Sequence, residues 1–334
     1  MSRKRAVVQK SLAVSWDRLA GMPKPLERLS KGELERKQCI SRLMTYELKY
    51  LTCQFVNEEF EWLLPVIFSK STDPLWPDPR ASIEKRIEVE IYGKSVRTTL
   101  SMILHKIVAC SLAYPKLFIL SPNVRIERTE RAYSGIHAYE FTQLDFEVKS
   151  ATSKEIKSLV EKILRGLVSS LKKQMRKELI YLKRHDSLKV PEIPFRTYDR
   201  EELQERYGRN WETQLMLETC DPIWVTNIPR EFYDFEDFDQ NKWDNYDLLM
   251  PKYGEVLSGA RREYEYDKIT RKMERDNIRK ENYQTLLKLA KERRLKPSAG
   301  AGIGIERLVN WIAGAKHVGE TQPFPKIPGL VYDL

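Results

Sequence analysis

Three short segments of the sequence hold residues whose types and spacing can do chemistry, and the first is a predicted hairpin. Arg125 and Glu127 lie two residues apart in a strand and therefore on one face, and the return strand places Gln143 and Asp145 on a shared face. An arginine held on a sheet binds phosphate bidentately and neutralises charge that develops during nucleotidyl transfer. Taken alone, the R-x-E pattern is explained more simply by a cross-strand ion pair.

The second segment, residues 300–307, reads GAGIGIER. Its spacing differs from the dinucleotide fingerprint G-x-G-x-x-G, and no β-α-β unit follows it, which excludes a Rossmann site. Glycines at alternate strand positions instead leave a flat platform for a planar base. Arg307, at the start of the following helix, can stack on an adenine or reach a terminal phosphate.

The third segment contains two carboxylates, Asp247 and Glu255, on neighbouring strand positions. Carboxylate oxygens are hard ligands suited to Mg²⁺, which bridges the phosphates of ATP. Each acid by itself is more simply a solvated or salt-bridged side chain. The co-occurrence of all three segments is what favours a nucleotide-dependent enzyme.

The elements that must position these residues follow from hydrophobic periodicity. We expect helices over residues 33–59, 101–112, 153–184 and 263–293, and strands over 60–68, 87–92, 96–100, 117–120, 124–128, 140–148, 222–228 and 246–250. Strands 124–128 and 140–148 suit an antiparallel hairpin, and Ser101 is placed to cap its helix. Pro65 cannot donate to a ladder, so its strand should lie at an edge or an interface. This order predicts an α+β fold with a mainly antiparallel sheet, over residues 36–334, after a basic N-terminal extension of residues 1–35.

Composition and charge narrow the class of protein. The 334 residues are 41% hydrophobic, enough for a globular core, and no apolar run is long enough to cross a membrane, so we expect a soluble, cytoplasmic protein. The four cysteines and four histidines lack metal-ligand spacing, which argues against a zinc enzyme. Residues 1–40 and 151–200 concentrate the net charge of +10. A lysine-rich outer helix face explains this charge better than a nucleic-acid patch.

Together the segments resemble the class II aminoacyl-tRNA synthetases. Pro65 resembles the motif 1 proline, Arg125-Ile-Glu127 with EFTQLDFE resembles motif 2, and GIGIERL resembles motif 3. The aspartyl and asparaginyl enzymes match best within that class. The match is closer still to their paralogue, the archaeal AMP-forming asparagine synthetase, in TDPLWPDP, SMILHK, YEFTQLDFE, NIPREFYD, KPSAGAGIG and GAKH. The resemblance implies the class II catalytic core, a six- or seven-stranded antiparallel sheet flanked by helices, and a homodimer formed through motif 1.

The resemblance also implies roles at a nucleotide site. Arg125 and Arg307 would be catalytic, with Arg125 on the α-phosphate and Phe141 stacked on adenine opposite Arg307. The ATP-binding set is Arg125, Glu127, His137, Phe141, Glu255, Gly304 and Arg307, and Asp247 and Glu255 would hold Mg²⁺.

At an amino-acid site, the resemblance implies that Lys106 and Arg262 grip the carboxylates of aspartate. Asp73, Ser101, Gln143, Asp145 and Ser258 complete the expected set. Two positions depart from the tRNA synthetases: Ile103 stands where they have Gln, and Pro297-Ser298 where they commonly have Pro-His. A changed pose is expected if the side-chain carboxylate of aspartate must meet the α-phosphate.

The leading hypothesis is therefore an aspartate–ammonia ligase that makes asparagine from aspartate, ATP and ammonia through a β-aspartyl adenylate. Only about 55 residues precede motif 1 in this sequence, which leaves no room for the anticodon-binding OB-fold of about 100 residues. A second hypothesis is a truncated synthetase that transfers an activated amino acid to RNA, docked on the basic helix. A third is a non-catalytic paralogue, which the full set of charged residues disfavours.

Overall fold

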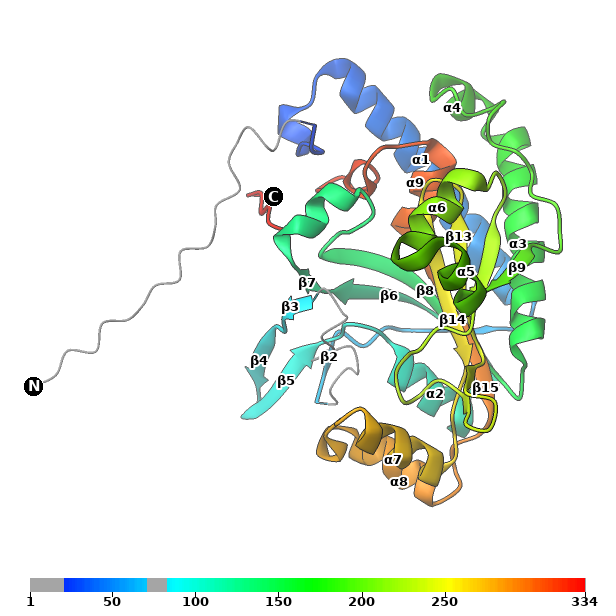
Figure 1. Ribbon diagram of the computed structural model, residues 1–334. Coiled ribbons are helices and arrows are strands. Elements are labelled where there is room, and N and C mark those ends of the chain that lie inside the picture. The colour runs from blue at the N-terminus through cyan, green and yellow to red at the C-terminus, as the bar shows by residue number, and fades with distance from the viewer. Residues whose placement is uncertain (1–20, 71–82, 334) are drawn as a thin grey trace, which may run out of the picture.

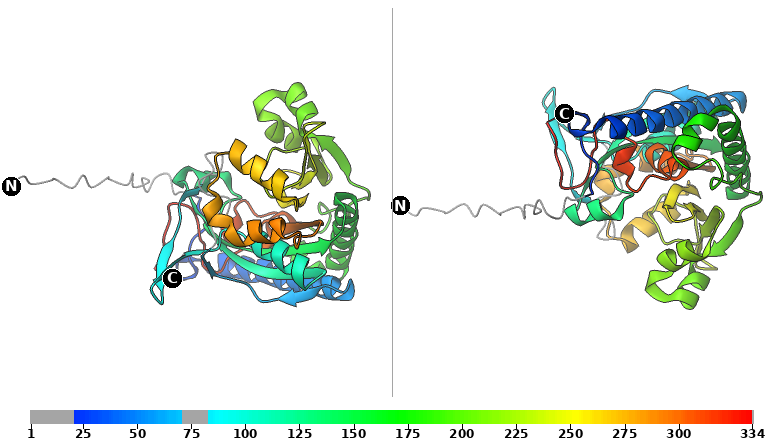
Figure 2. Two further views of the ribbon diagram at one scale, coloured as in Figure 1. Left: turned by 90° about the horizontal axis from the view of Figure 1, so that it is seen from below. Right: turned by 90° about the horizontal axis from the view of Figure 1, so that it is seen from above.

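The computed structural model describes residues 21–70 and 83–333, and Figures 1 and 2 show their arrangement. The helices are α1 Lys31–Asn57, α2 Ile103–Leu112, α3 Ser153–Gln174, α4 Arg176–Tyr181, α5 Arg200–Tyr207, α6 Trp211–Glu218, α7 Tyr266–Arg275, α8 Gln284–Lys291 and α9 Ile305–Ala313. The strands are β1 Glu61–Leu63, β2 Phe68–Ser69, β3 Ile83–Lys85, β4 Glu88–Ile91, β5 Lys94–Thr98, β6 Lys116–Val124, β7 Ile126–Glu127, β8 Glu140–Lys149, β9 Arg196–Asp199, β10 Ile223–Thr226, β11 Glu236–Asp237, β12 Lys242–Trp243, β13 Asn245–Met250, β14 Gly254–Arg261 and β15 Ser298–Gly304.

An eight-stranded sheet in the order β1-β6-β8-β15-β14-β13-β10-β9 forms the centre of the molecule. Its central pairings are antiparallel, whereas β1 with β6 and β9 with β10 are parallel. The α+β fold with a mainly antiparallel sheet is confirmed. The sheet exceeds the expected six or seven strands because a parallel strand is added at each edge.

Helices cover both faces of this sheet, and this fixes where the core lies. Phe118, Leu144 and Phe146 pack with α1, α3 and α9 in the largest apolar cluster. Helix α2 lies on the other side with α7 and α8, where a second cluster includes Phe232. Because successive strand residues point to opposite faces, the polar residues of β8 at 143, 145 and 147 face α2.

The beginning of the first helix is specified locally. Ser30 and Glu33 form a reciprocal capping box at the N-terminus of α1. Strand β1 follows α1 at the edge of the sheet, and Pro65 lies two residues after it, as expected for a residue that cannot donate to a ladder. None of the helices in the described residues is long and apolar enough to span a membrane.

Four local expectations need correction. The hairpin partner of β8 is β6, with Val124 opposite Glu140, whereas the short β7 pairs with β3. Helix 153–184 is interrupted at Met175, and helix 263–293 is interrupted where Asn277 takes a left-handed φ of 53°. Met102 is the N-cap of α2, and Ser101 accepts instead from the Ile103 N–H. Periodicity is continuous across such breaks, so it does not reveal them.

Candidate functional site

The floor of the candidate site is made by the matched faces of β8 and β15. Gly304, Gly302 and Gly300 stand opposite Gln143, Asp145 and Glu147. A Cβ at Gly302 would lie 2.8 Å from Asp145 Oδ1, and one at Gly300 would lie 2.3 Å from Glu147 Oε2. The glycines therefore leave room for polar side chains, and the flat platform inferred from the sequence is occupied in part by the chain itself.

A cavity of about 360 Å³ opens above this floor. Its walls come from the end of the β6–β8 hairpin, the loop after β10, β14 and the start of α9. All seven residues of the expected ATP-binding set line it, together with Gln143 (Arg125, Glu127, His137, Phe141, Gln143, Glu255, Gly304 and Arg307). The fold thus gathers residues that are up to 182 positions apart in the sequence.

The two expected catalytic arginines are each held by hydrogen bonds to backbone carbonyls. Arg125 Nε donates to the Leu100 carbonyl at 3.0 Å, and its guanidinium lies 5.0 Å from the centre of the Phe141 ring. Arg307 Nε donates to the Ile136 carbonyl and its Nη1 to the Glu255 carbonyl, both at 3.0 Å. Each contact orients the guanidinium while leaving other N–H groups for an anionic ligand.

His137 is kept neutral by this setting. Burial, followed by the charges of Arg307, Arg131 and Arg125, lowers the pKa of His137 to about 3. Its Nδ1 lies 2.6 Å from Ser134 Oγ. At neutral pH the imidazole is therefore a hydrogen-bonding group, and the positive charge of this wall comes from the arginines.

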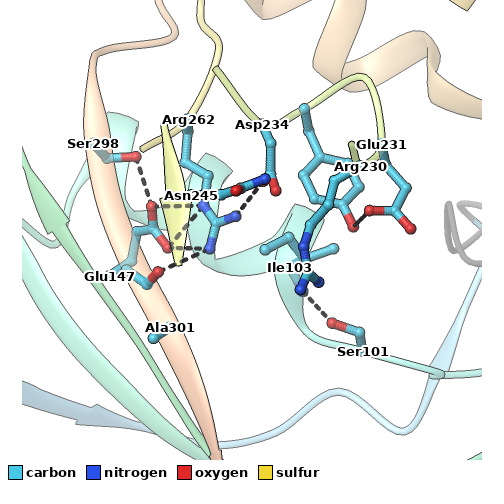
Figure 3. A network of polar contacts seen from close by, with 12 residues as sticks. Ser101, Ile103, Glu147, Arg230, Glu231, Asp234, Asn245, Arg262, Ser298 and Ala301 are labelled. Atoms are coloured by element: carbon cyan, nitrogen blue, oxygen red, sulfur yellow. Dashed lines mark hydrogen bonds and ion pairs between the residues drawn. The ribbon is translucent and has the colours of Figure 1, made fainter. Parts of the chain in front are cut away.

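The expected aspartate-binding cations lie deeper, in a buried network shown in part in Figure 3. Lys106 Nζ donates to Asp145 Oδ1 and to the Ala301 carbonyl, both at 3.0 Å. Arg262 donates from Nη1 to Asp234 Oδ1 at 2.6 Å and from Nε to Glu147 Oε1 at 3.2 Å. Both cations are at most 3% exposed, so each has an internal carboxylate partner before any substrate binds.

One acceptor in this network is left over. Asp145 Oδ2 is buried and has no hydrogen-bond partner among the described residues. A buried, unpaired carboxylate oxygen is costly unless a ligand satisfies it. Asp145 therefore offers an unused acceptor on the same face of β8 as Gln143, which lines the cavity.

The other expected amino-acid residues are spread around this network. Ser258 is paired with Asp247 across β13 and β14, and Ser101 lies at the start of α2, outside the lining of the cavity. Asp73 lies outside the described residues.

The expected metal ligands are close together but already engaged. Arg230 Nη2 lies 2.5 Å from both carboxylate oxygens of Asp247, and Glu255 Oε1 lies 3.5 Å from Arg307 Nη1. Burial raises the pKa of Asp247, and Arg230 opposes that shift. No group of three or more His, Cys, Asp or Glu side chains suited to a metal occurs in the described part of the chain. Two carboxylates fit a metal ion that arrives with ATP and keeps phosphate ligands, but not a resident metal held by protein alone.

Comparison with known proteins agrees with this geometry. The family model "tRNA synthetases class II (D, K and N)" matches residues 85–328, most of the chain. The chain belongs to this family.

Two curated relatives in this class II family are asparagine–tRNA ligases. The protein of Mycoplasmopsis pulmonis is 28% identical over 268 residues, which are 71% of this chain and 58% of the relative. The protein of Thermococcus kodakarensis is 31% identical over 240 residues, which are 65% of this chain and 54% of the relative. The chain therefore spans less than two thirds of the length of these relatives.

Solved class II structures have the same fold. Asparaginyl-tRNA synthetase from Pyrococcus horikoshii, complexed with asparaginyl-adenylate, superposes with a TM-score of 0.80 at 22% identity, over 93% of this chain and 76% of that one. The Entamoeba histolytica enzyme in complex with the same adenylate gives 0.74 at 18% identity, over 87% and 67%. The class II catalytic core expected from the motifs is confirmed.

Sequence reasoning missed four charged residues of the cavity wall. They are Arg131, Arg230, Glu231 and Glu306. Both carboxylate oxygens of Glu306 accept from the Thr142 N–H at 3.0 Å, which ties α9 to β8. Arg230 and Glu231 stand in the string NIPREFYD, whose resemblance was the only signal that pointed to them.

Proposed function

We propose that this class II chain is an AMP-forming asparagine synthetase. Aspartate and ATP would form an enzyme-bound β-aspartyl adenylate and pyrophosphate, and ammonia would then release asparagine and AMP. Adenylation turns a poor leaving group into a good one, so the protein needs chiefly to position the reactants and offset charge.

The observation that carries this proposal is the meeting of four sequence strings at one cavity and its floor. SMILHK supplies Lys106 and YEFTQLDFE supplies Gln143 and Asp145. NIPREFYD supplies Arg230 and Glu231 to the wall, and KPSAGAGIG is the glycine strand β15. These are the strings that resemble the archaeal asparagine synthetase most closely, so the resemblance is concentrated where the chemistry would occur.

At the nucleotide end, adenine would lie between Phe141 and Arg307, and Arg125 would hold the α-phosphate. Arg125 would then stabilise the charge that develops as the aspartate carboxylate attacks phosphorus. His137 and Glu127 would contact the nucleotide. Asp247 and Glu255 would hold Mg²⁺ that enters with ATP, and the ion would supply charge neutralisation along the phosphates.

At the amino-acid end, Asp145 Oδ2 would accept from the α-ammonium of aspartate, because it is the unpaired buried oxygen of the network. Lys106 lies beside it, and Gln143 would bind at the cavity floor. Arg262 would reach a substrate carboxylate only by exchanging it for Asp234, its closest partner.

A second candidate acceptor is RNA, because the curated relatives described above are named as tRNA ligases. Exposed cations also follow the outer side of α3, namely Lys154, Lys162, Arg165 and Lys173. Such a face binds phosphate backbones in a salt-dependent way, although it equally suits solvent.

The two candidates are separated by ATP–pyrophosphate exchange with each amino acid in turn, without RNA. An asparagine synthetase exchanges with aspartate and converts the activated intermediate when ammonium is added. Exchange with asparagine alone, or charging that requires tRNA, would contradict the proposal and favour the RNA acceptor.

We further propose that the chain forms a homodimer along α1 and the sheet edge at β1. Large apolar side chains are exposed there, namely Val56, Trp62, Leu64, Ile67 and Phe68, and such patches mark protein interfaces. Light scattering after size exclusion would give twice the chain mass of 39.4 kDa. Trp62→Glu would shift the protein toward the monomer.

A further inference from the structure

The loop between β10 and β11 runs from the cavity wall to the buried network around Arg262. Arg230 on this loop binds Asp247 at 2.5 Å, on the side of the expected phosphates. Asp234, four residues later, binds Arg262 at 2.6 Å on the amino-acid side. Glu231 follows Arg230 on the same loop and lines the cavity. Figure 3 shows its side chain beside that of Arg230. Glu231 thus belongs to the part of the wall that lies next to both the Arg230–Asp247 pair and the buried network, where the nucleotide and the amino acid would meet.

The Glu231 carboxylate is held but not neutralised by an ion pair. Its Oε2 accepts from the Tyr233 hydroxyl at 3.1 Å. Among the described residues no cation forms an ion pair with Glu231, since Arg230 is committed to Asp247. Burial raises the pKa of Glu231, and Arg230 opposes this shift. A half-buried carboxylate that lines a cavity in this way is suited to bind a small cation and to accept a proton.

We infer that Glu231 binds the ammonium ion and accepts its proton before it attacks the adenylate, an inference that rests on the proposed function. The other acceptor suited to an ammonium group, Asp145 Oδ2, lies on the sheet floor and would take the α-ammonium of aspartate. The two carboxylates therefore divide two chemically similar cations between them.

The proton and electron balance is complete with these groups. Ammonium gives one proton to the Glu231 carboxylate and becomes ammonia. The nitrogen lone pair forms a C–N bond to the β-carbonyl carbon, and the carbonyl π electrons move to oxygen. When they return, the C–O bond to AMP breaks and AMP keeps that electron pair. The nitrogen passes its surplus proton to the phosphate of the departing AMP.

The test uses Glu231→Gln, which keeps the shape of the side chain and removes the base. Aspartate-dependent ATP–pyrophosphate exchange needs no ammonium, so we expect its rate and its KM for aspartate to stay within about twofold. We expect asparagine formation to fall about 100-fold, the low end of general-base contributions, with a raised KM for ammonium. Hydroxylamine, which is largely unprotonated at neutral pH, should still give aspartyl hydroxamate at a rate close to that of the wild type.

Two further variants keep the test decisive. Glu236→Gln removes a carboxylate from the same segment that is bonded to Arg275 and does not line the cavity, and it should not change the KM for ammonium. Tyr233→Phe removes the hydroxyl donor of Glu231. If Glu231→Gln does not fold, Tyr233→Phe must raise the KM for ammonium while exchange persists, or the inference fails.

Two results would overturn the assignment of Glu231. Asparagine formation by Glu231→Gln with an unchanged KM for ammonium would exclude it as the ammonium site. A raised KM for aspartate in the exchange reaction would show that Glu231 binds the amino group of aspartate instead. Failure of the proposed function is distinguishable, because the wild-type protein itself would then show no exchange with aspartate.

Discussion

Replacing Arg125 by alanine separates the chemistry of the cavity from the stability of the fold. In the described part of the chain, the Arg125 side chain donates a hydrogen bond to the Leu100 carbonyl at 3.0 Å and contacts the Phe141 ring at 5.0 Å. A net hydrogen bond contributes about 1 kcal/mol and a cation–π contact about 0.5–1 kcal/mol. The free energy of unfolding should therefore fall by no more than about 2 kcal/mol.

The same substitution should nearly abolish adenylate formation. A preorganised cation aimed at developing charge is worth a factor of about 10²–10³ in rate. The assay is aspartate-dependent ATP–pyrophosphate exchange, read together with urea unfolding of the same samples. Arg128→Ala is the matched control, because Arg128 is exposed, lies three residues away and does not line the cavity.

Either of two outcomes would refute this reasoning. Exchange by Arg125→Ala at a rate near that of the wild type would remove Arg125 from the transition state. A loss of exchange equal in Arg128→Ala would show that total charge, and not the position of Arg125, is what matters.

Three further predictions follow from other contacts. Arg230→Gln removes the ion-pair partner of Asp247. Calorimetry without ATP should then show Mn²⁺ binding about tenfold tighter than in the wild type. Unchanged binding would show that Arg230 does not compete with a metal. Gly300→Ala places a Cβ 2.2 Å from a carbonyl oxygen of β8. The free energy of unfolding, measured in urea, should fall by about 3 kcal/mol. A urea midpoint equal to that of the wild type would mean that β8 and β15 move apart easily. Glu47 is fully buried and has no hydrogen-bond partner within residues 21–70 and 83–333. Burial raises the pKa of Glu47 well above 4.5 and that of Glu306 to about 6. Between pH 4.5 and the raised pKa of each group, the folded state therefore binds more protons than the unfolded state. Within that window the free energy of unfolding should fall as pH rises, by up to about 1.4 kcal/mol per pH unit for each group. Glu47→Gln should reduce this slope, and an unchanged slope would contradict the assignment.

The sequence predicted the elements and residues that depend on local pattern. Alternate glycines indicated a strand with an open face, and β15 has that face opposite Gln143, Asp145 and Glu147. The spacing of Arg125 within its hairpin placed it at the cavity, although the pairing partner was wrong, since β6 and not β7 pairs with β8. Periodicity specifies which face a residue occupies, but register also depends on the partner strand.

The buried charges could not be predicted in the same way. Lys106 and Arg262 were expected to bind substrate carboxylates, yet each already contacts carboxylates of its own chain. Asp234 reaches Arg262 from a loop without regular secondary structure, where no periodic signal exists. Only tertiary packing shows that such a cation is paired and buried, because the cost of burial is met by a distant partner.

The central claim is tested most directly by the fate of the nitrogen. Purified protein is incubated with aspartate, ATP, Mg²⁺ and ¹⁵N-ammonium, without RNA, and the products are analysed by mass spectrometry. The account predicts asparagine labelled in its side-chain amide and formed in equal amount with AMP. AMP without labelled asparagine, together with amino-acid transfer once tRNA is added, would contradict it.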